Sequence, residues 1–285
     1  MKKLTALLLC VGLLAGCSSS GYDVKIKDSS DVLVSGEGLN ITKQEYFEDL
    51  LDKYGATKIM SEILDAIADK EITDTKEINT ALAKKKKTYA SYSDGDLKAY
   101  AQSVGYESEE KYIEEVLLPE VKQELLRKKY IKENYKSLLK DYQVVRFKKI
   151  TVDKESTALK IIKASTNETA FDKQMKKYNS SAEDSGIVNK NSTLDDNLKK
   201  KLEKLSQITK DGVYKDAIKL SDDKYAVIFI YDTKRKNQNE YIESLSNDQD
   251  IKEEIEGKYL KKYNFEVYDS KLKKAIKELS SQYIE

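Results

Sequence analysis

The chain has 285 residues, of which 39% are hydrophobic and 35% are charged, and its formal charge at pH 7 is +1. A chain of this length can bury a core of its own, as one large domain or as two ordinary ones. It contains no histidine, which excludes a Ser-His-Asp triad and the commonest zinc ligand. Lysine and glutamate are intermixed along it, so no field strong enough to hold nucleic acid is expected.

The first 16 residues have the features of a signal peptide. Lys2 and Lys3 precede an apolar segment, 4–14, which has the length of a signal-peptide core and is too short for a membrane span of about 20 residues. Cys17 follows two small residues, and this pattern resembles the lipobox of bacterial lipoproteins. The resemblance implies export, cleavage before Cys17 and attachment of lipid, including palmitate, to the Cys17 thiol. The alternative is a plain signal peptide that is cleaved nearby, with Cys17 incidental.

Removal of the signal peptide would change both the cysteine content and the charge. Cys10 lies in the removed segment, so the mature chain would keep only Cys17 and could form no internal disulfide. The loss of two lysines would leave a formal charge of −1. No calcium-loop pattern is present, and no metal or cofactor is expected. Residues 17–31 are expected to form a lipidated tether, because Cys17 is followed by a Ser-Ser-Ser-Gly segment.

Residues 32–141 read as an N-terminal helical domain after a short strand at Val32–Val34. Thr42 and Glu45 form a capping box that begins a helix, and Gly55 is expected to end it. Further helices are expected over 59–67, from near Asp74, from near Ser93 and from near Ser108, the last kinked at Pro119 and reaching about Leu139. The run Lys84–Lys87 predicts a solvated helix face, with contact to anionic headgroups or wall polymers as the alternative.

The pattern changes at residue 142 to that of a small α+β unit, 142–235. A strand is predicted over 144–152, helices over 155–164 and 168–178, a polar loop over 179–193, a helix over 194–204, and strands over 213–220 and 225–231. Residues 236–285 are again helical. We therefore expect an α+β fold, in which 142–235 is inserted into a mostly helical domain whose first and last parts pack together.

This organisation resembles the PrsA-type foldases of Gram-positive bacteria and, more distantly, the SurA-type periplasmic chaperones. The resemblance rests on the lipobox at Cys17 and on the segment 38–47, which looks like the family's opening Gly-x-x-Ile-Thr-x-x-Glu-aromatic helix. It rests also on Ile150–Val152, Ala158 and Phe171–Lys173, which match the apolar skeleton of the parvulin fold. It implies a SurA-like chaperone domain built from both chain ends, with a parvulin-type peptidyl-prolyl isomerase (rotamase) domain inserted between them.

Three departures from the family pattern bear on activity. Parvulins place one histidine before the first strand's Ile-Leu-Val and a second in the last strand; these positions are Lys149 and Ala226 here. The family's Gly-Gly-x-Leu-Gly loop is reduced to Gly186. The paired histidines belong to a hydrogen-bonded network under the proline pocket, and lysine, a donor only, cannot rebuild it together with alanine. We therefore expect a degenerate parvulin domain, although isomerisation needs only relief of a barrier of about 20 kcal/mol and residual activity stays open.

With the isomerase site degenerate, function would rest on surfaces that bind unfolded chains. The chain has 20 tyrosines, and seven in the helical domain are candidates for weak contact with clients: Tyr89, Tyr92, Tyr100, Tyr106, Tyr112, Tyr130 and Tyr135. The competing expectation is that most of them are half-buried on helix faces. The favoured function is a foldase that acts on newly secreted polypeptides, lipid-anchored to the outer face of the cell membrane and with dimerisation possible. The alternatives are an active prolyl isomerase, a solute-binding or adhesion lipoprotein, and a dedicated binding partner in an envelope complex.

Overall fold

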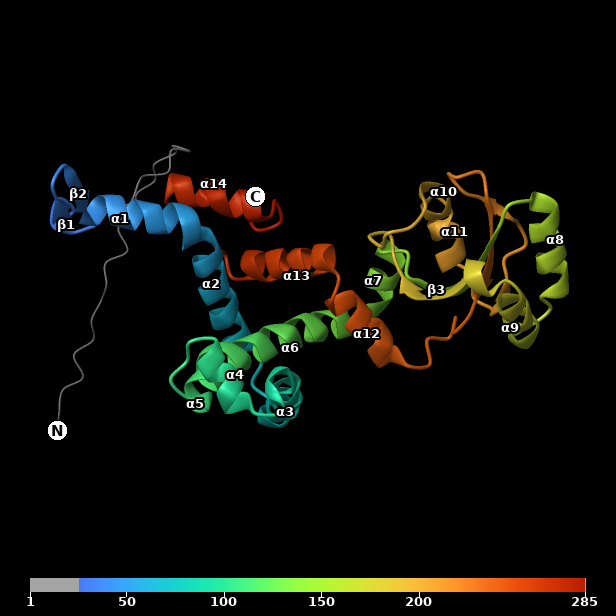
Figure 1. Ribbon diagram of the computed structural model, residues 1–285, viewed down its shortest axis with the longest axis horizontal. Helices are drawn as coiled ribbons and strands as arrows, with labels where there is room; N and C mark the ends of the chain where they lie inside the picture. The colour runs from blue at the N-terminus through green and yellow to red at the C-terminus, as the bar shows by residue number, and fades with distance from the viewer. Residues whose placement is uncertain (1–25, 285) are drawn as a thin grey trace, which may run out of the picture. The chain divides into compact units, whose positions relative to one another are not determined.

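The computed structural model describes residues 26–284, which divide into two compact units (Figure 1). Unit one contains the described residues up to Met60 together with those from Phe265 onward, and unit two is Ser61–Asn264. The predicted signal peptide, Cys17 and most of the tether lie outside the described residues. The domain boundaries at 141/142 and 235/236 stay predictions.

Unit one consists of a hairpin, a helical segment and the last helix. Strands β1 (Val32–Gly36) and β2 (Leu39–Thr42) pair antiparallel, and the hairpin turn contains Gly38 at a φ of 73°. Helix α1 (Lys43–Leu50) starts at the predicted capping box, where the backbone N–H of Thr42 donates to Glu45 Oε2 at 2.7 Å. Helix α14 (Ser270–Leu279) packs on the segment that follows α1 and buries Leu272 and Ile276.

The expectation that Gly55 ends the first helix is wrong. A π-helical turn, η1 (Leu51–Gly55), leads from α1 directly into α2 (Ala56–Glu71). A Cβ at Gly55 would lie 2.7 Å from Leu51 Cδ1, so the missing side chain makes room for Leu51 in the widened turn. The helical backbone continues through this π turn into α2, so Gly55 lies in a bulge and not at the end of a helix.

The helical part of unit two is built around a long central helix. Its elements are α3 (Thr75–Ala90), the 3₁₀ turn η2 (Ser91–Ser93), α4 (Leu97–Ser103), α5 (Glu109–Tyr112), the π turn η3 (Ile113–Leu117), α6 (Leu118–Glu133), α7 (Tyr135–Asp141), α12 (Gln238–Ser246) and α13 (Gln249–Lys262). Helices α3, α12 and α13 contact α6. Asp74, Asp96 and Ser108 cap the N-termini of α3, α4 and α5 with their side chains.

The helix that was predicted to kink at Pro119 and to reach about Leu139 has a different irregularity and a different end in the structure. The irregularity is the π turn η3, which ends just before Pro119 in the first turn of α6, where the missing N–H of proline costs least. The helix ends at Glu133 instead of continuing to Leu139, and Asn134 separates it from α7.

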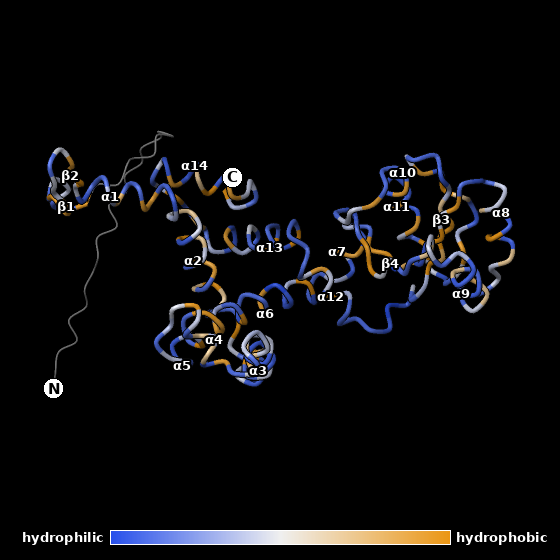
Figure 2. Tube along the Cα trace, viewed as in Figure 1, coloured by the Kyte–Doolittle hydropathy of each residue, from blue (hydrophilic) through white to orange (hydrophobic). Residues whose placement is uncertain are grey.

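The remaining part of unit two is an antiparallel sheet between two pairs of helices (Figure 1). Strands β3 (Val145–Val152), β4 (Ala182–Val188), β5 (Gly212–Val213) and β7 (Tyr225–Ile230) lie in the order β4-β3-β7-β5, and β6 (Ile218–Lys219) also pairs with β7. Helices α8 (Glu155–Ala164) and α9 (Glu168–Lys177) cover one face, and α10 (Asp196–Lys199) and α11 (Leu202–Ser206) cover the other. Figure 2 shows hydrophobic residues along the central strands, whereas α13 is mostly hydrophilic.

The alternation of β3 and β7 assigns each side chain to one face of this sheet. Phe147, Ala226 and Ile228 belong to the core under α10 and α11. Ile150 and Phe229 belong to the core under α8 and α9. Both cores are apolar and buried, which fits the partial alternation of β3 and the continuous apolar run of β7 at the centre of the sheet.

Three predictions in this region need correction. The polar loop predicted over 179–193 contains β4, preceded by the 3₁₀ turn η4 (Asn179–Ser181). The helix predicted over 194–204 is the two short helices α10 and α11. The strand predicted over 213–220 is only the two short pairings β5 and β6, separated by residues 214–217.

The predicted fold class, α+β, is confirmed by these helices and the antiparallel sheet. Among the described residues, none of the helices combines the length and the apolar character needed to cross a membrane.

Candidate functional site

Lys149 and Ala226, which the sequence resemblance predicts to stand where parvulins carry histidines, lie on the same face of the sheet but not in one site. Lys149 of β3 is opposite Ile228 of β7, and Ala226 is opposite Thr151, two pairs further along. Ala226 is 0% exposed and packs in the core with Ile218 and Ile228. The aminoalkyl chain of Lys149 instead reaches the sheet edge, where Nζ lies 3.0 Å from Glu183 Oε1 of β4.

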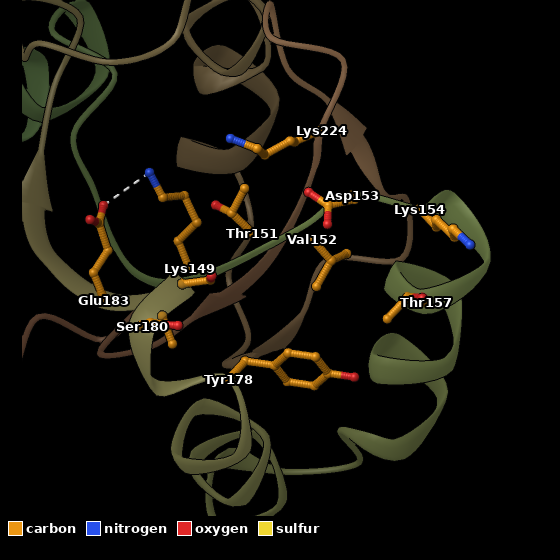
Figure 3. Close-up of a pocket in the computed structure, with 12 residues that line it drawn as sticks. Lys149, Thr151, Val152, Asp153, Lys154, Thr157, Tyr178, Ser180, Glu183 and Lys224 are labelled. Atoms are coloured by element: carbon orange, nitrogen blue, oxygen red, sulfur yellow. Dashed lines mark ion pairs between the residues drawn. The ribbon is translucent and has the colours of Figure 1, made fainter.

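A pocket of about 500 Å³ opens where β3 extends beyond β4 (Figure 3). The β3–β4 pairing ends at Ile150 opposite Ala182, so Thr151 and Val152 have no partner on that side. The start of α8, the turn η4 and the loop before β7 complete the wall. Its other lining residues are Lys149, Asp153, Lys154, Thr157, Tyr178, Ser180, Ser181, Ala182, Glu183 and Lys224.

The lining of this pocket is mainly polar and its charges are balanced. The hydrogen bond from Lys149 lowers the pKa of Glu183, against the opposing effect of burial. Lys224 is paired with Asp222 at 2.8 Å, and this bond raises the pKa of Lys224. Such a pocket offers hydroxyl, amine and carboxylate groups to peptide backbone, but its walls do not form the apolar slot that would enclose a prolyl ring.

A polar network that no sequence pattern indicated lies on the opposite face of the sheet. The Tyr231 hydroxyl donates to Asp184 at 2.6 Å and accepts from Arg146 Nε at 2.9 Å. Burial, together with the bond to Asp184, raises the pKa of Tyr231 to about 12. Lys148 binds Asp172 of α9 at 2.7 Å and Glu168 at 2.8 Å. The only local sign is that Arg146 and Lys148 are the polar residues of the alternating start of β3, and their partners are remote in sequence.

Five of the seven candidate tyrosines form one continuous cluster in the helical part, which we call the tyrosine ladder. Its members are Tyr89, Tyr92, Tyr100, Tyr106 and Tyr112. Neighbouring rings have centroids 5.1–6.0 Å apart in edge or tilted geometry. This is the separation at which aromatic pairs attract each other beyond their buried area.

The ladder has a buried ring at its centre and an exposed ring at one end. Tyr112 contacts three other ladder rings and is 3% exposed, and burial raises its pKa to about 12. Tyr92 is 67% exposed at the outer end, next to Tyr89 and Tyr100, which are half-buried. The Tyr89 hydroxyl donates to Glu120 at 3.1 Å. The expectation of half-buried rings therefore describes most of the ladder, and Tyr92 is the exception.

The other two candidate tyrosines are not part of the ladder. Tyr130 of α6 packs edge-on against Tyr259 of α13 at 6.0 Å. The hydroxyl of Tyr135 is buried and has no hydrogen-bond partner among the described residues. Neither side chain is exposed, so both belong to helix packing.

Two of the four lysines in the run of α3 are in ion pairs, and the other two are exposed to solvent. Lys85 lies 2.8 Å from Glu120 and Lys86 lies 3.1 Å from Glu109, whereas Lys84 and Lys87 are exposed. Two of the four amines thus hold α3 to α5 and α6. Among the described residues, no group of three or more His, Cys, Asp and Glu side chains is arranged to hold a metal ion.

No protein-family model and no curated protein matches the chain. The chain is similar, over most of its length, to solved structures of PrsA proteins. Foldase protein PrsA from Streptococcus pneumoniae is 20% identical and aligns over 89% of this chain and 100% of that one, with a TM-score of 0.38. PrsA from Bacillus subtilis is 23% identical over 87% of this chain and 99% of that one, with a TM-score of 0.41.

A third structure, a peptidylprolyl isomerase (PrsA) from Bacillus cereus, is 18% identical over 88% of this chain and 99% of that one, with a TM-score of 0.46. All three are PrsA proteins, the kind of protein that the sequence resembles.

Proposed function

We propose that this protein is a membrane-anchored extracytoplasmic foldase that binds newly exported polypeptides while they fold. The tyrosine ladder carries this proposal. A row of touching rings, most of them half-buried, that ends in the exposed Tyr92 offers an aromatic surface with polar edges, which suits weak contact with many different unfolded segments.

The location of the protein follows from the N-terminal pattern. Lipidation of Cys17 and removal of residues 1–16 would place the helical and α+β parts outside the membrane on a polar tether. Newly translocated chains emerge at that surface, so a holdase anchored there meets them before they fold or aggregate.

In this proposal the α+β part has weak or absent prolyl isomerase activity. Lys149 is engaged with Glu183 and Ala226 is enclosed in the core, so neither supplies the hydrogen bonds of the histidines that parvulins carry. The α+β part would then act mainly as a folded domain that contributes surface for contact with polypeptides.

The test is the refolding of a protein whose slow step is proline isomerisation, with the fragment from Ser18 to Glu285 added at substoichiometric and at equimolar levels. We expect an unchanged rate and a higher yield at equimolar levels. A faster rate at substoichiometric levels would show an active isomerase and would overturn the proposed loss of activity. If both the rate and the yield stayed unchanged, the foldase proposal itself would be overturned, and a dedicated binding partner would be favoured.

A further inference from the structure

Within the described residues, the ring faces of the tyrosine ladder differ from those of six other tyrosines in one respect. Six tyrosines elsewhere in the described chain have a lysine or arginine of the same chain over the ring, 4.1–5.9 Å from its centroid: Tyr142, Tyr178, Tyr231, Tyr241, Tyr259 and Tyr263. Within the part of the chain that the structure describes, none of the five ladder rings has such a cation.

Two lysines of α3 that lie close to Tyr89 in the sequence are held by carboxylates. Lys85 lies 2.8 Å from Glu120 and 3.3 Å from Glu124, and Lys86 lies 3.1 Å from Glu109. The ring of Tyr92, which is 67% exposed, is therefore open to a cation from another chain.

Carboxylates lie close to the exposed end of the ladder. Between Ser91 and Glu120 there are eight acidic residues and two lysines, a net charge of −6, and the lysine run at 84–87 reduces the surplus over 84–120 to −2. Asp94 and Asp96 lie two and four residues after the exposed Tyr92, and both are exposed. Glu114 and Glu115 are exposed on η3, and neither is in an ion pair within the described residues. The outer end of the ladder thus combines an exposed ring with nearby negative charge.

Open π faces and surplus carboxylates attract the same kind of group. A lysine ammonium or an arginine guanidinium is drawn to the face of a tyrosine ring, and arginine also stacks on it through its planar group. Nearby carboxylates add attraction that falls with salt concentration. An acidic or neutral segment would gain only the apolar part of the contact.

We propose that the tyrosine ladder is a docking surface for cationic segments of unfolded polypeptides, in which a lysine or arginine side chain lies over Tyr92 and Tyr100 while Asp94 and Asp96 attract it. This inference rests on the proposed function and names the chemistry of the client. It gives the foldase a preference for basic stretches of extended chain over acidic ones of equal apolar content.

The preference can be measured with short, unstructured Gly-Ser-Asn peptides that carry arginine, lysine, glutamine or glutamate as guest residues and an uncharged fluorophore. Binding to the fragment from Ser18 to Glu285 is followed by fluorescence anisotropy at low and at high salt. We expect the affinity to rise in the order glutamate, glutamine, lysine, arginine, by about two- to fivefold for each cation that docks on a ring.

Two variants of Tyr92 distinguish the contribution of its ring to binding from that of the surrounding charge. At high salt, where the attraction of the carboxylates is screened, Tyr92→Ala should abolish the preference for arginine over glutamine, whereas Tyr92→Phe, which keeps the π face, should retain it. Tyr54→Ala is the matched control, because Tyr54 is 63% exposed against 67% for Tyr92 and lies outside the ladder. Since Tyr92 is exposed, circular dichroism should show that its variants keep the fold.

The outcomes distinguish this inference from the proposed function. A preference for cations that has the same size in Tyr92→Ala and in the parent, and that high salt removes from both, would assign it to long-range charge alone and overturn the docking surface. Binding of all four peptides with equal affinity would also overturn it, but would leave the foldase proposal standing. Failure of every peptide, together with failure to raise refolding yield, would overturn both.

Discussion

At the scale of single residues, Glu71 shows how one carboxylate ties three helices of unit two together. It lies at the end of α2 and accepts hydrogen bonds from Lys129 of α6 at 2.9 Å, from Lys262 of α13 and from the Tyr263 hydroxyl at 2.9 Å. The bonds from Lys262 and Lys129 lower the pKa of Glu71 from 4.5 to about 2, against the effect of burial. The ionised form is thus strongly preferred in the folded state.

This shift makes a pH-dependent contribution to stability. Because the folded-state pKa of Glu71 lies below its unfolded-state value, the contribution is fully present above about pH 4.5 and is lost as the pH falls toward 2. We expect Glu71→Gln to lower the free energy of unfolding by about 1–2 kcal/mol near neutral pH, after allowance for solvent screening, and by much less in acid.

Urea unfolding at neutral and at acidic pH measures this effect. Glu133→Gln is the control, because Glu133 is exposed and is in no ion pair within the described residues. An equal loss of stability for Glu71→Gln at both pH values would contradict the assignment to ionisation.

Ala226 carries a second prediction at this scale. Its site is fully enclosed, so Ala226→His would force an imidazole into a packed core and should lower the free energy of unfolding by about 1–3 kcal/mol. Lys149→His, at the partly exposed sheet edge, should change it by less than about 0.5 kcal/mol. Denaturant midpoints compare the two. An Ala226→His protein as stable as the parent would mean that the core can open to rebuild a histidine pair.

At the scale of elements, β4 depends on one glycine. Gly186 has a φ of 64°, and the β3–β4 register shifts between Phe147 and Lys148 close to it. A side chain in this left-handed region costs about 1–2 kcal/mol, so Gly186→Ala should destabilise by about that amount. Gly212→Ala is a matched control, because Gly212 is also a strand glycine with open space around its Cβ position but has no positive φ. Thermal unfolding of the two variants should therefore differ, and equal melting temperatures would contradict the role given to the left-handed backbone.

The same strand shows where prediction from the sequence ended. Thr42 with Glu45, and the alternation of β3, are local signals, and the structure has the capping box and the strand where they indicate them. Glu183, Asp184 and Ser185 give β4 a polar composition, so its pairing comes from the open edge of β3 and not from its own propensity.

The sequence likewise predicts only part of each candidate site. The tyrosines are visible in the sequence, but their stacking is not, because it depends on how α3, α4 and α5 pack. The pocket beside Lys149 results from the different lengths of β3 and β4, which no local pattern records.

At the scale of the whole molecule, polar contacts help to join the sheet of unit two to its helices. Asn189 and Asn191 each donate to Asp248, at 2.8 Å in both cases, and the Tyr142 hydroxyl donates to Glu254 at 2.5 Å. Polar junctions of this kind are typical of parts that move relative to each other more readily than an apolar interface allows.

One prediction concerns where the whole molecule is located, which depends on the proposed lipid attachment at Cys17. Cys17→Ser removes the thiol that lipid attachment requires, so we expect the protein to move from the membrane fraction to the soluble exported fraction. Cys10→Ser, which changes a thiol inside the predicted signal peptide, should leave the protein in the membrane fraction. Cell fractionation with immunodetection compares the two variants. A Cys17→Ser protein that stays with the membrane would show that something other than this thiol holds it there.

The chain contains 20 tyrosines and no tryptophan, and the five rings of the ladder are spaced 5.1–6.0 Å apart. Rings this close pass electronic excitation to one another, so light absorbed anywhere in the ladder is shared among its members. A client tryptophan at Tyr92 would collect that energy and emit it at a longer wavelength. The protein therefore carries its own optical donor, and capture of a tryptophan-bearing chain can be followed in real time without any dye.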